Sequence, residues 1–216
     1  HPEQDAEVIT MAYKIYETFG IEGLSVRINS IGSAEIRKPY LATLRVALNT
    51  VKSDLCNTCQ QRIDKNALRL FDCKNPTCQE ILNKNAPFIF EHITDDDHAH
   101  FNRVTTILDE MKIPYNHDRK LVRGLDYYTH TTFEITSSTL GSQDALCGGG
   151  RYDKLVEELG GKSTPAVGFA AGMERLFIAF GDEGEHDHSI ADIYFLTLGE
   201  KATLKGMVLA EQLREK

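Results

Sequence analysis

Residues 121–128 read LVRGLDYY, and this stretch decides how the rest of the chain is interpreted. A strand that only packs a core does not need an arginine, an aspartate and two tyrosines so close together, because each is costly to bury without a partner. Arg123 precedes Gly124, where a backbone can approach a ligand closely, and its guanidinium offers a planar fork of donors to a carboxylate or a phosphate. In an extended segment Tyr127 and Tyr128 point to opposite sides, so at most one would lie with Arg123. The simpler alternative is an Arg–Asp ion pair on a tyrosine-rich sheet face.

A second unusual stretch, residues 147–153, reads CGGGRYD. Gly148, Gly149 and Gly150 inside a strand would cost conformational entropy and give no side-chain packing, so the space above them is expected to hold a substrate. The spacing matches neither the GxGxxG nor the Walker pattern, which excludes Rossmann and P-loop sites. An ordinary glycine turn is the alternative.

A third stretch, residues 168–176, reads GFAAGMERL and predicts a strand that runs into a helix. Arg175 lies just inside this helix, where it could reach a triphosphate, or it could be an ordinary exposed charge. We find no Ser-His-Asp, HExxH or paired-carboxylate pattern. The chemistry that these motifs favour is therefore positioning and charge neutralisation of a phosphate by arginine.

Outward from these motifs, periodicity predicts a mixed α and β protein. Alternating residues predict strands over 24–29 and 131–136, another strand is expected over 144–150, and helical spacing predicts helices over 3–19, 41–51, 94–111 and 151–159. Thr94 is the predicted N-cap of its helix, followed by three aspartates that suit a helix N-terminus. A nearly continuous apolar strand is expected over 190–198, before a last helix. The stretch between the second and third helices is polar, and we expect it to be irregular.

The composition of the chain argues against some classes of function. The 216 residues have 24 basic and 32 acidic side chains and a net charge of −8, which argues against a generic nucleic-acid or membrane-surface binder but allows a local basic patch. The longest apolar tract, residues 166–180, contains Glu174 and Arg175 and is too short for a bilayer span. The chain starts without a methionine and ends inside a periodic segment, so we expect an internal piece of a longer protein.

Four of the five cysteines are clustered as two close pairs, Cys56 with Cys59 and Cys73 with Cys78. Two short-spaced thiol pairs joined by a loop are the pattern of a tetrahedral zinc site, although the second spacing is wider than usual. Zinc held by four cysteines would be structural, because no coordination position stays open. The alternative is four reduced, partly buried thiols. Cys147 is most simply a small buried residue.

The motifs together resemble a known family. LVRGLDYYTHTTFE from residue 121, GSQDALCGGGRYDKL from residue 141 and TPAVGFAAGMERL from residue 164 resemble the catalytic core of a bacterial-type histidyl-tRNA synthetase, a class II aminoacyl-tRNA synthetase. DAEVI at residues 5–9 and INSIGS at 28–33 also match. The resemblance implies an α+β fold, with an antiparallel sheet flanked by helices, a helical insertion and the start of a C-terminal α/β domain. The implied parts are catalytic core at 1–33 and 118–181, helical insertion at 34–117, linker at 182–189 and truncated anticodon-binding domain at 190–216.

The resemblance also implies an activity, which is ATP-dependent formation of histidyl-adenylate and transfer of histidine to tRNA(His). By motif, Arg123 resembles the arginine that contacts the ATP α-phosphate and the histidine carboxylate, and Arg175 the class II arginine on the ATP phosphates, with Mg²⁺ adding positive charge. Tyr128 and Tyr152 resemble the pair that encloses the imidazole, with Tyr127 beside them, above a floor of residues 148–150. The insertion would lie against the tRNA acceptor arm. The full-length protein would be a cytoplasmic homodimer without a membrane partner.

Two motifs of the family are missing from these 216 residues, and two alternative functions share the resemblance. The family's dimer-forming first motif and its second-motif loop would lie before residue 1, so we expect the 216 residues alone to be inactive. One rival is the histidine-sensing regulatory subunit of ATP phosphoribosyltransferase, which shares the fold but typically lacks the full RGLDYY motif. The other is a synthetase-like, tRNA-sensing domain of a stress kinase, against which the short insertion argues.

Overall fold

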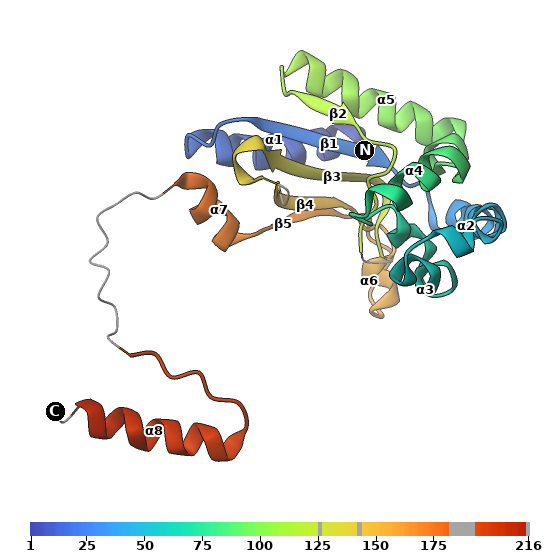
Figure 1. Cartoon of the computed structure of the whole chain (residues 1–216). Helices are drawn as coiled ribbons and strands as arrows, with labels where there is room; N and C mark the ends of the chain where they lie inside the picture. Colours follow the sequence, from blue (N-terminus) through green and yellow to red (C-terminus); the bar gives the residue numbers. More distant parts are fainter. Residues whose placement is uncertain (125–126, 142–143, 182–192, 215–216) are drawn as a thin grey trace. The chain divides into compact units, whose positions relative to one another are not determined.

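The computed structural model describes residues 1–124, 127–141, 144–181 and 193–214. Its contacts divide the chain into two compact units, His1–Gly181 and Asp182–Lys216 (Figure 1). The first unit contains every motif singled out above.

The first unit is built on a five-stranded sheet in the order β2-β1-β3-β4-β5. Its strands are β1 (Leu24–Ser30), β2 (Tyr115–His117), β3 (Thr129–Ser137), β4 (Ala145–Arg151) and β5 (Val167–Ala171). Neighbouring strands are antiparallel, except that β2 runs parallel to β1 at one edge. The predicted α+β fold is confirmed. β2 escaped prediction because three residues are too few for an alternating pattern.

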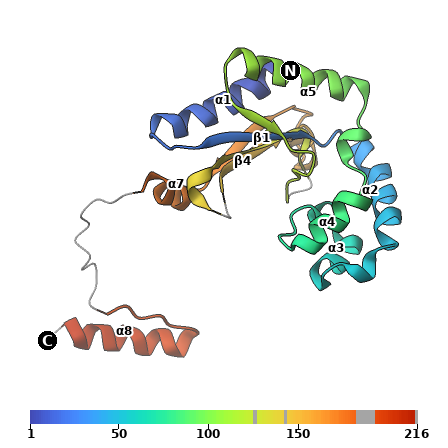
Figure 2. The ribbon, with the colours of Figure 1, turned by 45° about the horizontal axis from the view of Figure 1, so that its top comes forward.

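Two long helices, α1 (Pro2–Thr18) and α5 (Asp95–Glu110), lie side by side against one face of this sheet (Figures 1 and 2). Each fully buried large apolar side chain of this layer contributes about 1.5–3 kcal/mol. The layer's core is formed by Ala6, Ile9, Ala12, Val26, Ile28, Phe101, Val104, Leu108, Phe133 and Ile135. The predicted start of α5 is confirmed, since Thr94 and Asp97 form a reciprocal capping box.

Three further helices gather beyond one end of the sheet, and we call them the helical lobe (Figure 2). They are α2 (Ala34–Asn49), α3 (Asn57–Lys65) and α4 (Pro76–Asn85), joined by the 3-10 turns η1 (Lys52–Asp54) and η2 (Ala67–Leu70) and followed by η3 (Ile89–Glu91). The lobe has its own core, which includes Leu44, Leu48, Ile63, Leu70 and Leu82. The expectation of an irregular cysteine stretch is wrong. α3 is only nine residues long, and most of its side chains are polar, since it buries only Cys59 and Ile63.

The lobe does not extend to the end of the predicted insertion, residues 34–117. Its apolar cluster contains Ile93, whereas α5 and Ile113 pack with the sheet layer. Packing thus separates the lobe from α5, although the lobe's apolar cluster also includes Ile31, Val122 and Tyr128 from outside residues 34–117.

The remaining elements of the first unit are one 3-10 turn and two short helices. The 3-10 turn η4 (Ser138–Leu140) follows β3, and α6 (Leu155–Glu158) and α7 (Met173–Phe180) flank β5. α6 is shorter than the predicted helix over 151–159, because Arg151 continues β4. Gly181 ends α7 in the left-handed conformation, at φ 59°.

In the second unit, the described residues 193–214 contain one helix, α8 (Glu200–Arg214). The strand predicted over 190–198 is wrong where it can be judged, since residues 193–198 join no sheet within the described part of the chain. Apolar character alone does not make a strand, because its backbone groups need a neighbouring strand as partner. The predicted linker over 182–189 lies outside the described residues. Among the described helices, none combines the length and apolar composition needed to cross a bilayer.

Candidate functional site

The sheet face opposite α1 and α5 presents a row of charged and glycine positions. Glu134 of β3 is in register with Arg27 of β1 on one side and with Gly148 of β4 on the other. Residues in register on neighbouring strands share a face. Accordingly, Arg27 Nη1 lies 3.2 Å from Glu134 Oε2, and Arg27 also pairs with Asp118.

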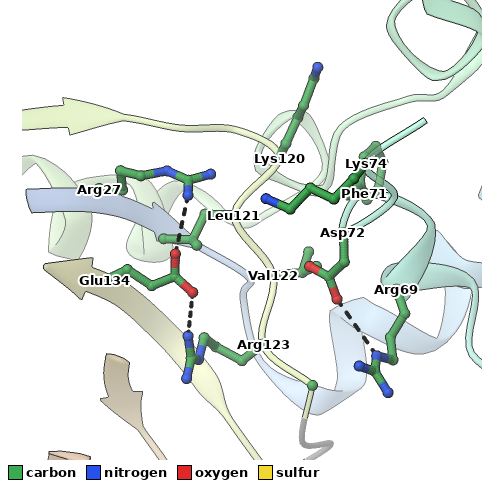
Figure 3. A pocket seen from close by; sticks show the side chains of 11 residues that line it. Arg27, Arg69, Phe71, Asp72, Lys74, Lys120, Leu121, Val122, Arg123 and Glu134 are labelled. Atoms are coloured by element: carbon green, nitrogen blue, oxygen red, sulfur yellow. Dashed lines mark hydrogen bonds and ion pairs between the residues drawn. The ribbon is translucent and has the colours of Figure 1, made fainter. Parts of the chain in front are cut away.

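Arg123 reaches this row from the segment before β3. Its Nη1 donates to Glu134 Oε1 at 2.6 Å (Figure 3). A Cβ added to Gly148 would lie 2.4 Å from Arg123 Nη1 and 2.6 Å from Cζ, so the guanidinium rests directly on the bare backbone of that glycine. Nothing among the described residues accepts a hydrogen bond from the buried Nε of Arg123. The Arg123 side chain as a whole is half-buried, and a guanidinium with an unused donor is suited to bind a further acceptor.

A cavity of about 360 Å³ opens beside this arginine, between the sheet and the helical lobe (Figure 3). Five basic and two acidic side chains line it, with three apolar residues and Gly124. We call it the basic cavity, and its lining is Arg27, Arg69, Phe71, Asp72, Lys74, Lys120, Leu121, Val122, Arg123, Gly124 and Glu134. The excess of positive charge suits an anionic ligand such as a phosphate or a carboxylate.

The surroundings of Glu134 and Asp72, the two acidic side chains of the basic cavity, disfavour their charged forms. Burial raises the pKa of Glu134, although the charges of Arg123 and Arg27 oppose this. Burial likewise raises the pKa of Asp72, against the charge of Arg69. The site therefore disfavours these two negative charges, and an anionic ligand would compete with Glu134 for Arg123.

The predicted tyrosines gather close to Arg123. The rings of Tyr127 and Tyr128 are 4.7 Å apart between centroids, and Tyr127 and Tyr152 are 6.1 Å apart in an edge-on arrangement. The Arg123 guanidinium lies 5.8 Å from the Tyr128 ring centroid. The extended segment that would point Tyr127 and Tyr128 to opposite sides is not formed, because both residues precede β3.

The three predicted floor glycines do not face one way. A Cβ on Gly150 would lie 2.4 Å from the carbonyl oxygen of Thr131 and 3.1 Å from the Tyr128 ring, whereas one on Gly149 would meet Phe169 and Phe133 of the sheet layer. Successive residues of a strand face opposite sides, so Gly149 cannot share the floor with its neighbours. This corrects the prediction for Gly149.

Arg175 does not line the basic cavity. It lies at the start of α7, and its Nη1 donates to the carbonyl oxygen of Ala145 at 2.8 Å. The structure therefore brings together Arg123, the tyrosines, Gly148 and Gly150, and leaves Arg175 at the beginning of β4.

Cys56, Cys59, Cys73 and Cys78 converge in the helical lobe, and we call them the thiol cluster. Their four Sγ atoms all lie within 4.8 Å of one another. Cys59 and Cys78 are buried, and Cys56 and Cys73 are half-buried. A hydrogen bond from the backbone of Cys59 is the main reason that the pKa of the Cys56 thiol falls to about 7, whereas burial raises the pKa of Cys59.

Sequence reasoning missed most of the lining of the basic cavity. Arg27 and Glu134 occupy the polar positions of predicted alternating strands, so a shared polar face was foreseeable, but their pairing depends on a register that only the fold sets. Arg69, Asp72 and Lys74 come from the lobe, and no local pattern marks them.

Comparison with known proteins gives a consistent result. A family model described as histidyl-tRNA synthetase matches residues 1–176. The histidine–tRNA ligase of Microcystis aeruginosa is 46% identical over 99% of this chain and 50% of that protein. That of Clostridioides difficile is 44% identical over 99% of this chain and 51% of that protein. The crystal structure of apo S. aureus histidyl-tRNA synthetase superposes with a TM-score of 0.65 at 37% identity, over 100% of this chain and 53% of that one. The chain thus spans about half the length of the curated relatives it matches.

Proposed function

Because the chain belongs to the histidyl-tRNA synthetase family, we propose that the complete protein containing it activates L-histidine with ATP and transfers the histidyl group to tRNA(His). The observation that supports this most is the guanidinium of Arg123, which rests on Gly148 beside the basic cavity and whose Nε has no acceptor among the described residues. Such an arginine can hold two anionic groups, a carboxylate and a phosphate, close to each other.

In the first step a carboxylate oxygen of histidine attacks the α-phosphorus of ATP, a new O–P bond forms, and pyrophosphate leaves with its P–O bond electrons. Two anions must approach, and negative charge spreads over the phosphate oxygens in the transition state. Arg123 is placed to orient both groups and to stabilise that charge, so no protein nucleophile is needed. Mg²⁺, when bound with ATP, supplies further charge neutralisation.

The remaining roles are assigned by position. Tyr127, Tyr128 and Tyr152 form an aromatic group near Arg123 that is suited to enclose an imidazole. Gly148 lets the Arg123 guanidinium approach the sheet closely, and Gly150 does the same for Thr131 and Tyr128, so both glycines permit the close packing around the proposed amino-acid site. We keep Arg175 as a proposed ATP contact on its motif alone.

Transfer to tRNA, a homodimeric state and a cytoplasmic location are further parts of this proposal, and each is supported by membership of the family. We also propose that the inserted helical lobe contacts the tRNA acceptor arm, and that residues 190–216 begin an anticodon-binding domain. The thiol cluster has no part in the chemical step proposed here.

The proposal is tested by histidine-dependent ATP–pyrophosphate exchange in the complete protein. Arg123→Ala is expected to lower the rate of adenylate formation by about 10²–10³-fold, because it removes a donor that is most needed in the transition state. Histidine affinity, measured by calorimetry, should fall much less. Arg103→Ala is the matched control, since Arg103 is an exposed arginine of α5 that pairs with Glu3.

Two outcomes would contradict the proposal. Equal losses in rate and histidine affinity would show that Arg123 binds only the ground state. Histidine binding without any exchange by the wild-type protein would support the regulatory-subunit alternative.

A further inference from the structure

The thiol cluster has the geometry of a metal site more than that of a core or a disulfide pair. Cys56 Sγ and Cys73 Sγ are 4.0 Å apart, and the largest separation in the cluster is within 4.8 Å. Four thiolates around a tetrahedral Zn²⁺, at Zn–S distances of about 2.3 Å, lie about 3.8 Å apart. Sulfur atoms joined in a disulfide are only about 2.05 Å apart. The cluster therefore needs to contract only slightly to hold a metal.

The elements around the cluster support metal binding. Cys56 is the N-cap of α3, Cys59 lies in the first turn of that helix, and Cys78 lies in the first turn of α4. The backbone N–H of Cys56 donates to Cys78 Sγ at 3.2 Å, a contact that stabilises a thiolate ligand. Two helix starts and one loop thus aim all four sulfurs at a single point, which packing of small apolar side chains does not require.

The same segment forms one wall of the basic cavity. Cys73 lies between Asp72 and Lys74, which both line that cavity. Gln79, next to Cys78, donates from its amide to the carbonyl oxygens of Phe71 at 3.1 Å and Cys73 at 2.6 Å. Gln79 Oε1 also accepts from Lys120 Nζ at 2.9 Å, and Lys120 lines the cavity from the opposite segment.

We propose that the thiol cluster binds one structural Zn²⁺ ion, and that this ion fixes the segment 71–79 as a wall of the basic cavity. The metal replaces the protons of the thiols, so binding releases up to about four protons per ion. With four thiolate ligands the ion has no open position for a substrate, so its role is to cross-link α3, α4 and the loop between them. The metal site does not depend on the proposed enzyme activity, and its test is independent of exchange assays.

The first experiment measures metal in the protein purified under reducing conditions without chelator. We expect about one zinc per chain by mass spectrometry of the metals. Replacement by Co²⁺ should give the visible absorption of a tetrahedral thiolate complex. A zinc content near zero with four reagent-accessible thiols would overturn the proposal, and so would the mass of a protein with two disulfides in the lobe.

Substitutions of single cysteines test which residues bind the ion. Cys56→Ser and Cys73→Ser change the two half-buried ligands, so the apolar core is least disturbed, and each is expected to lower zinc content at least about tenfold. Cys147→Ala, a buried cysteine of β4 outside the cluster, should keep full zinc content. Retention of zinc by Cys73→Ser would overturn the assignment.

Hydrogen exchange tests whether the ion fixes the segment 71–79. In the metal-free wild-type protein, the amides of residues 71–79 are expected to exchange at least about tenfold faster, while β1 and β3 keep their protection. Faster exchange confined to α3, with 71–79 unchanged, would show that the ion does not hold the wall.

Discussion

At the scale of single residues, Gly148 and Gly149 are adjacent in β4, but a side chain added to each would meet different atoms. A methyl group on Gly148 would meet the tip of the Arg123 side chain, at 2.4 Å from Nη1. A methyl group on Gly149 would meet backbone, at 2.3 Å from the carbonyl oxygen of Gly168, and the Cβ of Phe169 at 2.6 Å. A flexible side chain can move aside, but two paired strands cannot do so without loss of their ladder.

Gly148→Ala and Gly149→Ala should therefore separate activity from stability. We expect Gly148→Ala to displace Arg123 and lower histidine-dependent exchange by about 10²-fold, because small misplacements of a catalytic group are costly. Its free energy of unfolding should stay near that of wild type. Gly149→Ala should lower the free energy of unfolding by about 1–3 kcal/mol through overpacking. Urea denaturation and exchange assays of both variants check this, and equal destabilisation by the two would contradict it.

The sequence identified Arg123, the glycines and the tyrosines because their types are unusual for a strand. It could not orient them. The assignment of Tyr127 and Tyr128 to opposite sides assumed a strand that begins only at Thr129, and the role of Glu134 became visible only through its register with Gly148.

At the scale of elements, one buried carboxylate ties the helical layer to the sheet. Asp5 of α1 is fully buried and accepts hydrogen bonds from His100 of α5 at 2.7 Å and from Thr131 of β3 at 2.6 Å. It also pairs with Arg151 of β4, whose side chain is 7% exposed. Four elements thus meet at a single side chain.

Asp5→Ala is expected to lower the free energy of unfolding by about 3 kcal/mol, because it removes one partner from a buried charge network. Arg151 keeps Asp153 as a partner at 3.1 Å, which limits the loss. The matched control is Glu17→Ala, which breaks an exposed pair with Lys14 and should cost no more than about 1 kcal/mol. Urea denaturation at neutral pH measures both.

The same network predicts acid sensitivity. Burial alone would raise the pKa of Asp5, but hydrogen bonds from His100 and Thr131 and the charge of Arg151 outweigh it and hold this pKa below its usual value. A carboxylate with a lowered pKa in the folded state stabilises the fold above its unfolded pKa of about 3.9, and this stability is lost as the pH falls through the folded value. Unfolding free energy should therefore drop below about pH 4, and less steeply in Asp5→Ala. An identical pH dependence of the variant and the wild type would contradict this.

Elements with strong local signals were predictable, and those defined by packing were not. α5 was placed by its cap and its apolar face, and β1 and β3 by alternation. α3 and α4, of 9 and 10 residues, are short, and each buries only two residues in the core of the lobe. The apolar run at 193–198 shows the reverse case, in which strand composition lacks a strand partner among the described residues.

At the scale of the whole molecule, a net charge of −8 conceals local positive regions. The basic cavity is one. A second cavity of about 320 Å³ in the helical lobe is lined by four basic side chains and, among the described residues of its lining, no acidic one. The four are Arg37, Lys38, Arg45 and Lys65. Composition allowed such a patch but could not locate it, because α2 contributes three of these residues and α3 the fourth.

This second patch is the part of the lobe best suited to the phosphate backbone of tRNA, on the proposed function. Lys38 and Lys65 are both exposed, so charge reversal at either position disturbs no core. In the complete protein, the double variant Lys38→Glu and Lys65→Glu is expected to raise the KM for tRNA by about tenfold and to weaken the salt dependence of tRNA binding. Histidine-dependent exchange should remain at the wild-type rate, since neither lysine lines the basic cavity. Lys14→Glu, which makes the same charge change as either single substitution at an exposed position of α1, is the control and should leave the KM for tRNA unchanged. If the double variant charges tRNA as well as wild type at all salt concentrations, the tRNA contact lies elsewhere. If exchange and tRNA charging fall in parallel, the lobe acts through the shape of the basic cavity instead of through phosphate contacts.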